Sequence, residues 1–149
     1  MSKQDDCITS SFISHSPLET IAFGKKLGES LKPNSIVCFY GDLGAGKTTL
    51  IKGIVQGVTG KNYYVNSPTF VYLNIYDGIK SVFHFDLYRI QNEDEFVGMG
   101  FEEYFFSSGV CCIEWSERIV NIIPSNAVKI EMQHLDESSR QIVVREELR

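Results

Sequence analysis

The sequence has no long hydrophobic run. No apolar stretch reaches the roughly 18 residues that a membrane-spanning helix needs, so we expect no membrane partner. The segment Met1 to Ser16 contains Asp5 and Asp6 and lacks the apolar core of a signal peptide. Together these absences favour a protein of the cytoplasm.

Internal repeats, low-complexity segments and linkers rich in proline, glycine and serine are also missing. The 149 residues are 43% hydrophobic and 22% charged, close to the averages of globular proteins. This composition excludes a wholly disordered chain, a collagen and a coiled coil. We therefore expect a single domain over residues 1–149, in which the polar segment 1–14 is flexible.

Positive charge is scarce. Lysine and arginine number 14, against 19 aspartates and glutamates, which gives a net charge of −5. Binding to phosphate backbones requires clustered cations, so the chain is a poor non-specific binder of nucleic acid. Any role close to a nucleic acid would therefore run through a partner.

The four cysteines do not follow a zinc-binding spacing. Cys38 and the adjacent Cys111 and Cys112 lie in apolar segments. We therefore expect buried free thiols, which are typical of a reducing compartment.

The first half of the chain contains clear signals for a helix, a strand and a second helix. Ser16 as N-cap, Pro17 at the first helical position and Glu19 at the third mark a helix start. The apolar run 35–40 (SIVCFY) predicts a central strand covered on both faces. A glycine-rich turn follows it, and residues 48 to 58 are expected to be helical.

Further along, the sequence predicts two hairpins, a second buried strand and an interrupted acidic helix. Asp77-Gly78 is a strong hairpin-turn signal between two apolar segments. Buried runs combined with alternating segments predict an α/β domain with parallel central strands and some antiparallel pairing. The expected segments are a hairpin at 71–76 and 81–88, a helical segment at 92–106, a strand at 110–115 and a second hairpin at 127–132 and 141–144.

Residues 41–48 (GDLGAGKT) match the phosphate-binding pattern G-x-x-x-x-G-K-[ST] between an expected strand and an expected helix. Glycines let backbone N–H groups curl into an anion-binding nest, and the helix N-terminus adds partial positive charge. We expect Lys47 to reach the β- and γ-phosphates, Thr48 to bind Mg²⁺ and Thr49 to contact the α-phosphate. The expected nucleotide-binding residues of this segment are Asp42, Leu43, Gly44, Ala45, Gly46, Lys47, Thr48 and Thr49.

A phosphate site of this kind also needs an acidic residue close to the metal. Glu114 lies at the end of one apolar strand, and Asp86 follows the run 82–85. Ligands of open α/β sheets bind beyond the carboxyl ends of the parallel strands, which makes Glu114 the better placed of the two. The plainer alternatives are an ion pair of Glu114 with Arg118 and one of Asp86 with Arg89.

Four sequence blocks, taken in order, resemble the bacterial TsaE family of small P-loop ATPases. The resemblance extends from Ser16 to Val144. It implies a P-loop NTPase-like, three-layer α/β fold with a mixed, partly parallel central sheet. The blocks are GDLGAGKTT (41–49), SPTF (67–70), HFDLYR (84–89) and IEW (113–115).

The resemblance implies a Mg²⁺-dependent ATPase that acts as an accessory subunit in threonylcarbamoyladenosine modification of tRNA. Its ligands would be ATP or ADP and Mg²⁺, and its partner the TsaD–TsaB complex, through which it would meet tRNA indirectly. It would not itself transfer the threonylcarbamoyl group. The lack of a guanine-recognition motif favours ATP over GTP, and no arginine finger is evident, so we expect hydrolysis to be slow without a partner.

The same resemblance assigns roles to individual residues. Thr69 of the SPTF block would approach the γ-phosphate and the metal, although a turn-forming hydroxyl is the plainer interpretation. His84 accompanies Asp86 as an orienting or partner-contacting residue, and Arg140 is a candidate adenine or ribose contact. The expected catalytic residues are Lys47, Asp86, Glu114 and Thr69, and the expected metal ligands are Thr48, Glu114 and Asp86.

Two other functions fit the phosphate loop. A small-molecule kinase usually carries an arginine-rich lid, and here the arginines are scattered along the chain. A regulatory protein that senses ATP without hydrolysing it is the second alternative. Loss of activity on Glu114→Ala would separate an ATPase from such a binder.

Overall fold

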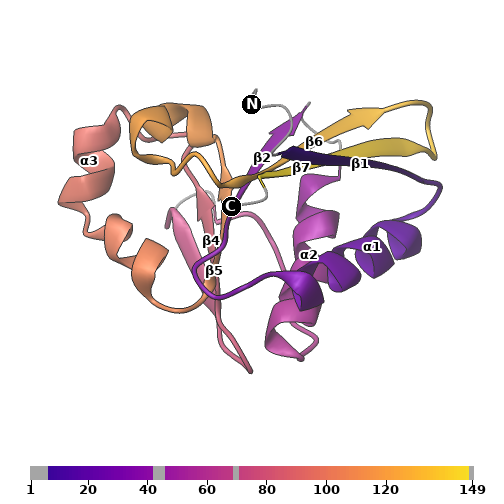
Figure 1. The fold of residues 1–149 in the computed structure, drawn as a ribbon, viewed down its shortest axis with the longest axis horizontal. Helices are drawn as coiled ribbons and strands as arrows, with labels where there is room; N and C mark the ends of the chain where they lie inside the picture. The colour runs from indigo at the N-terminus through magenta and orange to yellow at the C-terminus, as the bar shows by residue number, and fades with distance from the viewer. Residues whose placement is uncertain (1–6, 42–45, 69–70, 148–149) are drawn as a thin grey trace.

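The structure, a computed structural model, describes residues 7–41, 46–68 and 71–147 (Figure 1). Strands and helices alternate along most of this chain. In order, the elements are β1 (Cys7–Ser14), α1 (Pro17–Ser30), β2 (Ile36–Gly41), α2 (Lys47–Thr59), β3 (Leu73–Tyr76), β4 (Val82–Asp86), α3 (Glu93–Gly98), the 3-10 helix η2 (Phe101–Phe106), β5 (Val110–Glu114), the 3-10 helix η3 (Ser116–Ile122), β6 (Val128–His134) and β7 (Arg140–Glu147).

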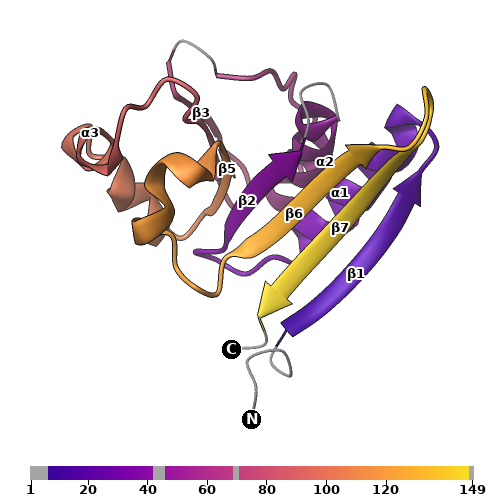
Figure 2. The same ribbon diagram turned by 90° about the horizontal axis from the view of Figure 1, so that it is seen from above.

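The described strands form one sheet of seven in the order β1-β7-β6-β2-β5-β4-β3, whose β1 edge is seen in Figure 2. The four strands β6, β2, β5 and β4 are parallel to one another. β1, β7 and β6 pair antiparallel, and so do β3 and β4. The prediction of an α/β fold with a mixed, partly parallel sheet is therefore confirmed, as are the two hairpins.

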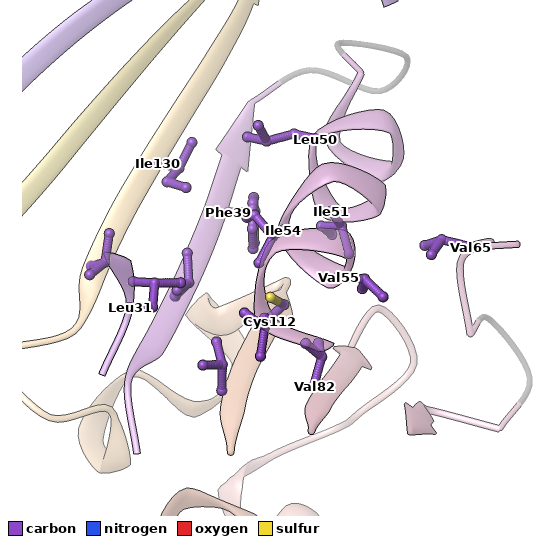
Figure 3. Packing of buried hydrophobic residues seen from close by; sticks show 14 of the residues in the cluster. Leu31, Phe39, Leu50, Ile51, Ile54, Val55, Val65, Val82, Cys112 and Ile130 are labelled. Carbon is purple, nitrogen blue, oxygen red and sulfur yellow. The ribbon is translucent and has the colours of Figure 1, made fainter. Parts of the chain in front are cut away.

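Helices cover both faces of the parallel strands β2, β5 and β4. Figure 1 shows α1 and α2 together on one side and α3 with the short helices on the other. On the α2 face, Phe39, Leu50 and Ile54 belong to one buried cluster (Figure 3). On the opposite face, Phe85 packs on Phe96 in a second cluster. The helix that follows the glycine-rich turn, α2, thus lies directly against the sheet.

Glycines set the close contact between α1 and α2. Gly24 and Gly28 of α1 face Gly53 and Gly57 of α2. A Cβ atom added at Gly53 would lie only 2.3 Å from the carbonyl oxygen of Ile21, so no larger residue fits without moving a helix. This contact fixes α2, and hence the phosphate loop, against the rest of the fold.

The expectation that the chain is flexible up to residue 14 is wrong for residues 7–14, which form β1. This strand pairs with β7 along its whole length, from Cys7 opposite Glu147 to Ser14 opposite Arg140. The Phe12 ring stacks on α1, its centroid 4.8 Å from that of Phe23. Strand pairing and one partly buried aromatic ring outweigh the polar composition of this segment.

The predicted start of α1 is confirmed. The hydroxyl of Ser16 accepts a hydrogen bond of 3.1 Å from the amide of Glu19, and Pro17 occupies the first turn. None of the helices in the part of the chain that the structure describes combines the length and apolar character needed to cross a bilayer.

Candidate functional site: a phosphate loop beside two buried carboxylates

The phosphate loop connects the end of β2 to the start of α2, as the sequence predicts. Gly41 ends β2 with φ 137°, and a Cβ there would lie 2.3 Å from the Met132 carbonyl oxygen. Gly46 precedes α2 in the left-handed region with φ 96°. Both conformations favour glycine, so the backbone explains why the motif has glycine at positions 41 and 46. The expected nucleotide contacts Asp42, Leu43, Gly44 and Ala45 lie outside the described residues.

The first turn of α2 presents the groups that an anion would meet. Lys47, Thr48 and Thr49 begin the helix, and the turn contains no acidic residue and no side-chain cap. The Lys47 ammonium donates a hydrogen bond of 3.2 Å to the Gly41 carbonyl, so this side chain reaches back across the loop. Free helix N–H groups, a cation and two hydroxyls together make an anion-binding end.

Strand register places the two candidate acids beside each other and next to the loop. Asp86 of β4 is paired with Glu114 of β5, and Glu114 is paired with Phe39 of β2, two residues before Gly41. Side chains alternate along a strand, and Phe39 belongs to the cluster that α2 covers. Asp86 and Glu114 therefore project from the α2 face at the carboxyl ends of two parallel strands.

Both carboxylates are largely buried and each is held by a specific partner. Glu114 is 7% exposed, and its Oε2 lies 2.8 Å from Nε2 of His84. Asp86 is 8% exposed; its Oδ2 accepts a hydrogen bond of 2.7 Å from Ser67, and its Oδ1 one of 3.1 Å from the Tyr88 amide. Buried carboxylates need such partners, since an uncompensated charge is costly away from water.

The ion pair of Glu114 with Arg118 that the spacing allowed does not form. Trp115 follows Glu114 in the left-handed region with φ 62°, which turns the chain out of the strand. The Arg118 guanidinium lies 5.6 Å from the Trp115 ring centroid and donates to the Tyr88 carbonyl at 3.4 Å. Asp86 accepts hydrogen bonds from Ser67 and from the Tyr88 amide.

Arg140 lies beside the phosphate loop, where the resemblance places a nucleotide contact. A Cβ added at Gly46 would lie 3.2 Å from Cδ of Arg140. Arg140 and Thr49 line a pocket of about 290 Å³ between the start of α1, the start of α2 and the β6–β7 turn. The sequence did not mark the other polar lining residues as nucleotide contacts; they are Ser14, His15, Ser16, Thr20, Glu137 and Ser138.

Thr69 lies outside the described residues, so its role stays a prediction. Ser67, two residues earlier in the same block, donates a hydrogen bond to Asp86, and no motif in the sequence marks it for this role. Within the described ranges, no group of three or more histidine, cysteine, aspartate or glutamate side chains forms a metal cluster. The expected metal ligands Thr48, Asp86 and Glu114 therefore stay a prediction.

A glycine turn between a buried strand and a helix, with acids at neighbouring strand ends, defines a P-loop-type α/β protein. The model of the family described as "Threonylcarbamoyl adenosine biosynthesis protein TsaE" matches residues 14–142, and this chain belongs to the TsaE family. The resemblance drawn from the four sequence blocks is thereby confirmed.

Curated relatives and one solved structure agree with this assignment. The chain is 36% identical over 132 residues to the TsaE protein of Treponema pallidum, covering 89% of this chain and 97% of the relative. It is 39% identical over 127 residues to that of Bacillus subtilis, covering 85% and 78%. The crystal structure of Bacillus subtilis YdiB superposes with a TM-score of 0.79 at 30% identity, covering 94% of this chain and 86% of that one.

Proposed function

We propose that this protein binds ATP with Mg²⁺ and hydrolyses it slowly, as an accessory subunit in the threonylcarbamoyladenosine modification of tRNA. The observation that carries the proposal is the register that sets Asp86 and Glu114 side by side, facing the helix that begins with Lys47 and Thr48. Family membership supports the pathway. In this role the chain acts in the cytoplasm with the TsaD–TsaB complex and leaves the transfer of the threonylcarbamoyl group to that complex.

Phosphate binding falls to the loop and the first turn of α2. Backbone N–H groups around Gly46 and the helix N-terminus favour the negative charge of the phosphates. The Lys47 ammonium would exchange its bond to the Gly41 carbonyl for the β- and γ-phosphates. The pocket beside Arg140 and Thr49 is the place for the ribose and base.

The residues present fit a magnesium ion. The Thr48 hydroxyl and a carboxylate from Asp86 or Glu114 are hard oxygen ligands of the kind Mg²⁺ prefers. When bound, the ion supplies charge neutralisation to the phosphates that it shares with Thr48. The burial of both acids is consistent with such a site, because a cation offsets the cost of a buried carboxylate.

Hydrolysis requires a water aligned with the γ-phosphate and a carboxylate that accepts its proton. One of Asp86 and Glu114 takes this task while Lys47 and the loop N–H groups stabilise the charge on the transferring phosphoryl group. Without an arginine finger the intrinsic rate is expected to be lower by about 10³ to 10⁵ than in a completed site. A partner that adds a cation would accelerate the reaction. Because the chain carries a net charge of −5, contact with tRNA is expected through that partner.

Phosphate release from Mg-ATP tests this proposal. We would measure it with the protein alone, then with the TsaD–TsaB pair, and then with tRNA added. Slow release that the pair stimulates supports the proposal, and its loss in Lys47→Ala assigns it to the loop. Lys52→Ala, on the same helix but away from its N-terminus, is the matched control and should behave like the wild type.

The alternatives give different outcomes. Release that persists in Lys47→Ala would contradict the assignment of the loop. Phosphate transfer to a nucleoside or sugar, without stimulation by the pair, would indicate a small-molecule kinase. ATP binding with no hydrolysis in the wild type, so that Glu114→Ala has no activity to remove, would indicate a regulatory binder.

A further inference from the structure

His84 is a buried polar residue on the α2 face of the sheet. It lies in β4 between two phenylalanines, is 0% exposed, and is paired in register with Cys112 of β5. Its neighbour Val82 and the paired Cys112 both belong to the apolar cluster that α2 covers. A polar ring in such surroundings is costly unless it is hydrogen-bonded, so its partner carries information about its role.

That partner is the carboxylate of Glu114, two residues along β5 from Cys112. Nε2 of His84 lies 2.8 Å from Oε2 of Glu114, across the diagonal that long side chains bridge between paired strands. An ionised carboxylate only accepts hydrogen bonds, so Nε2 is the donor.

The other ring nitrogen completes this assignment. Nδ1 of His84 is buried and has no hydrogen-bond partner among the described residues. A second ring proton would bury an N–H group without an acceptor, so the surroundings fit a ring with a single proton, on Nε2. The ring then has one function that the structure shows, which is to hold one oxygen of Glu114.

We infer that His84 is a positioning residue that fixes the carboxylate of Glu114 at the phosphate site through the Nε2–Oε2 hydrogen bond. The inference rests on the proposed function and adds to it a residue that acts through Glu114 rather than on the nucleotide. Asp86 has a different support, from Ser67 and the Tyr88 amide, so the link to His84 is specific to Glu114. Histidine–carboxylate supports of this kind typically change affinity or activity by about 10- to 100-fold when removed.

Two substitutions separate positioning from packing. His84→Leu fills similar space without a donor, whereas His84→Gln keeps an N–H group near the place of Nε2. We expect kcat for Mg-ATP hydrolysis to fall about 10- to 100-fold in His84→Leu, with KM changed by less than about twofold. His84→Gln should recover most of this loss. Equal losses in both variants, or a loss confined to KM, would overturn the inference.

A double-mutant comparison tests whether His84 acts through Glu114. In a Glu114→Gln background, His84→Leu should change kcat by less than about twofold, since the group it positions has been altered. The same loss as in the wild-type background would show an independent effect and contradict the inference. Thermal unfolding of each variant identifies those that fold, and the Glu114→Gln pair is compared only between folded proteins.

An NMR measurement does not depend on turnover. The ring ¹⁵N signals should show His84 protonated on Nε2 and bare on Nδ1. The side-chain carboxyl ¹³C signal of Glu114 should shift in His84→Leu and stay in place in His84→Gln. A proton on Nδ1, or an unmoved Glu114 signal in His84→Leu, would overturn the inferred hydrogen bond between His84 and Glu114. A wild-type protein that does not hydrolyse ATP would instead contradict the proposed function, while the NMR result would still report on this hydrogen bond.

Discussion

The two halves of the sheet are built differently. Strands β4 and β5 are buried at every residue, because helices cover both of their faces. β6 alternates between buried and exposed residues, because only the α1–α2 side of the antiparallel half is covered. The doubly covered half carries the acids at its strand ends, and the singly covered half contributes Arg140 and a pocket wall. The two candidate acids thus lie on the half of the sheet whose local unfolding would expose more buried apolar surface.

The largest effect that we expect is on the reactivity of the buried thiols, compared between the folded and the denatured protein. Cys38, Cys111 and Cys112 are free and lie in the doubly covered half, on β2 and β5. In a Cys7→Ser background, alkylation in the folded protein should be at least about 1,000-fold slower than in denaturant, since the reagent reaches these thiols only on opening. Mass spectrometry measures the rates. Rapid alkylation without denaturant would show that this half opens easily.

The same thiols predict a pH dependence of stability. Burial raises the pKa of Cys38 from 9.0 to about 11 and that of Cys111 to about 12. Their contribution to stability is complete below pH 9, where folded and unfolded thiols are both protonated. It is lost as the pH rises from 9.0 to about 11 for Cys38 and to about 12 for Cys111, because only the unfolded thiols ionise in that range. Urea unfolding should show this loss, and Cys38→Ala should lose less over the same range.

Two isoleucines compare the halves directly. Ile113 of β5 is 0% exposed, whereas Ile13 of β1 is 45% exposed. Ile113→Ala should lower the free energy of unfolding by about 2–5 kcal/mol through a cavity in the doubly covered half. Ile13→Ala should cost less than about 1 kcal/mol. Denaturant unfolding measures both, and equal costs would contradict the difference between the halves.

Two glycines test the helix pair that positions the phosphate loop. Gly53→Ala forces a Cβ against the Ile21 carbonyl and should cost about 1–3 kcal/mol of unfolding free energy. Gly98→Ala meets nothing within 4 Å and is the matched control, with a change of less than about 1 kcal/mol. A neutral Gly53→Ala would show that α1 and α2 can separate without strain.

The smallest effect is expected on the uncovered face. Arg145 and Glu131 form an ion pair of 2.8 Å between β7 and β6, with side chains 41% and 47% exposed. Exposed pairs contribute little, so Arg145→Gln should change the unfolding free energy by less than about 1 kcal/mol. The change should shrink further at high salt. A loss as large as that of Ile113→Ala would contradict the view of this face as solvated.

Much of the doubly covered half could be predicted from the sequence. The runs at 35–40 and 110–115 are continuously apolar, as strands with two covered faces require, and both are found as β2 and β5. The phosphate pattern and the Asp77-Gly78 turn each predict a local backbone conformation from the residues within the motif. Predictions from such local motifs hold in the folded protein because the conformations depend on few other residues.

The parts that were missed depend on distant residues. β1 forms because β7, more than 120 residues later, pairs with it, which the polar segment 7–14 does not reveal. The His84–Glu114 contact spans 30 residues and follows from the β4–β5 register. The spacing of Glu114 and Arg118 suggested an ion pair, but the left-handed backbone at Trp115 turns Arg118 toward the indole ring instead.

We expect the carboxylates at the strand ends to complete a hydrolytic site at the phosphate loop. The most direct test measures ATP binding and phosphate release side by side in the wild type and in Glu114→Ala. We expect the variant still to bind ATP and its turnover to fall by a factor of about 10² to 10⁴. Turnover equal to that of the wild type would contradict it.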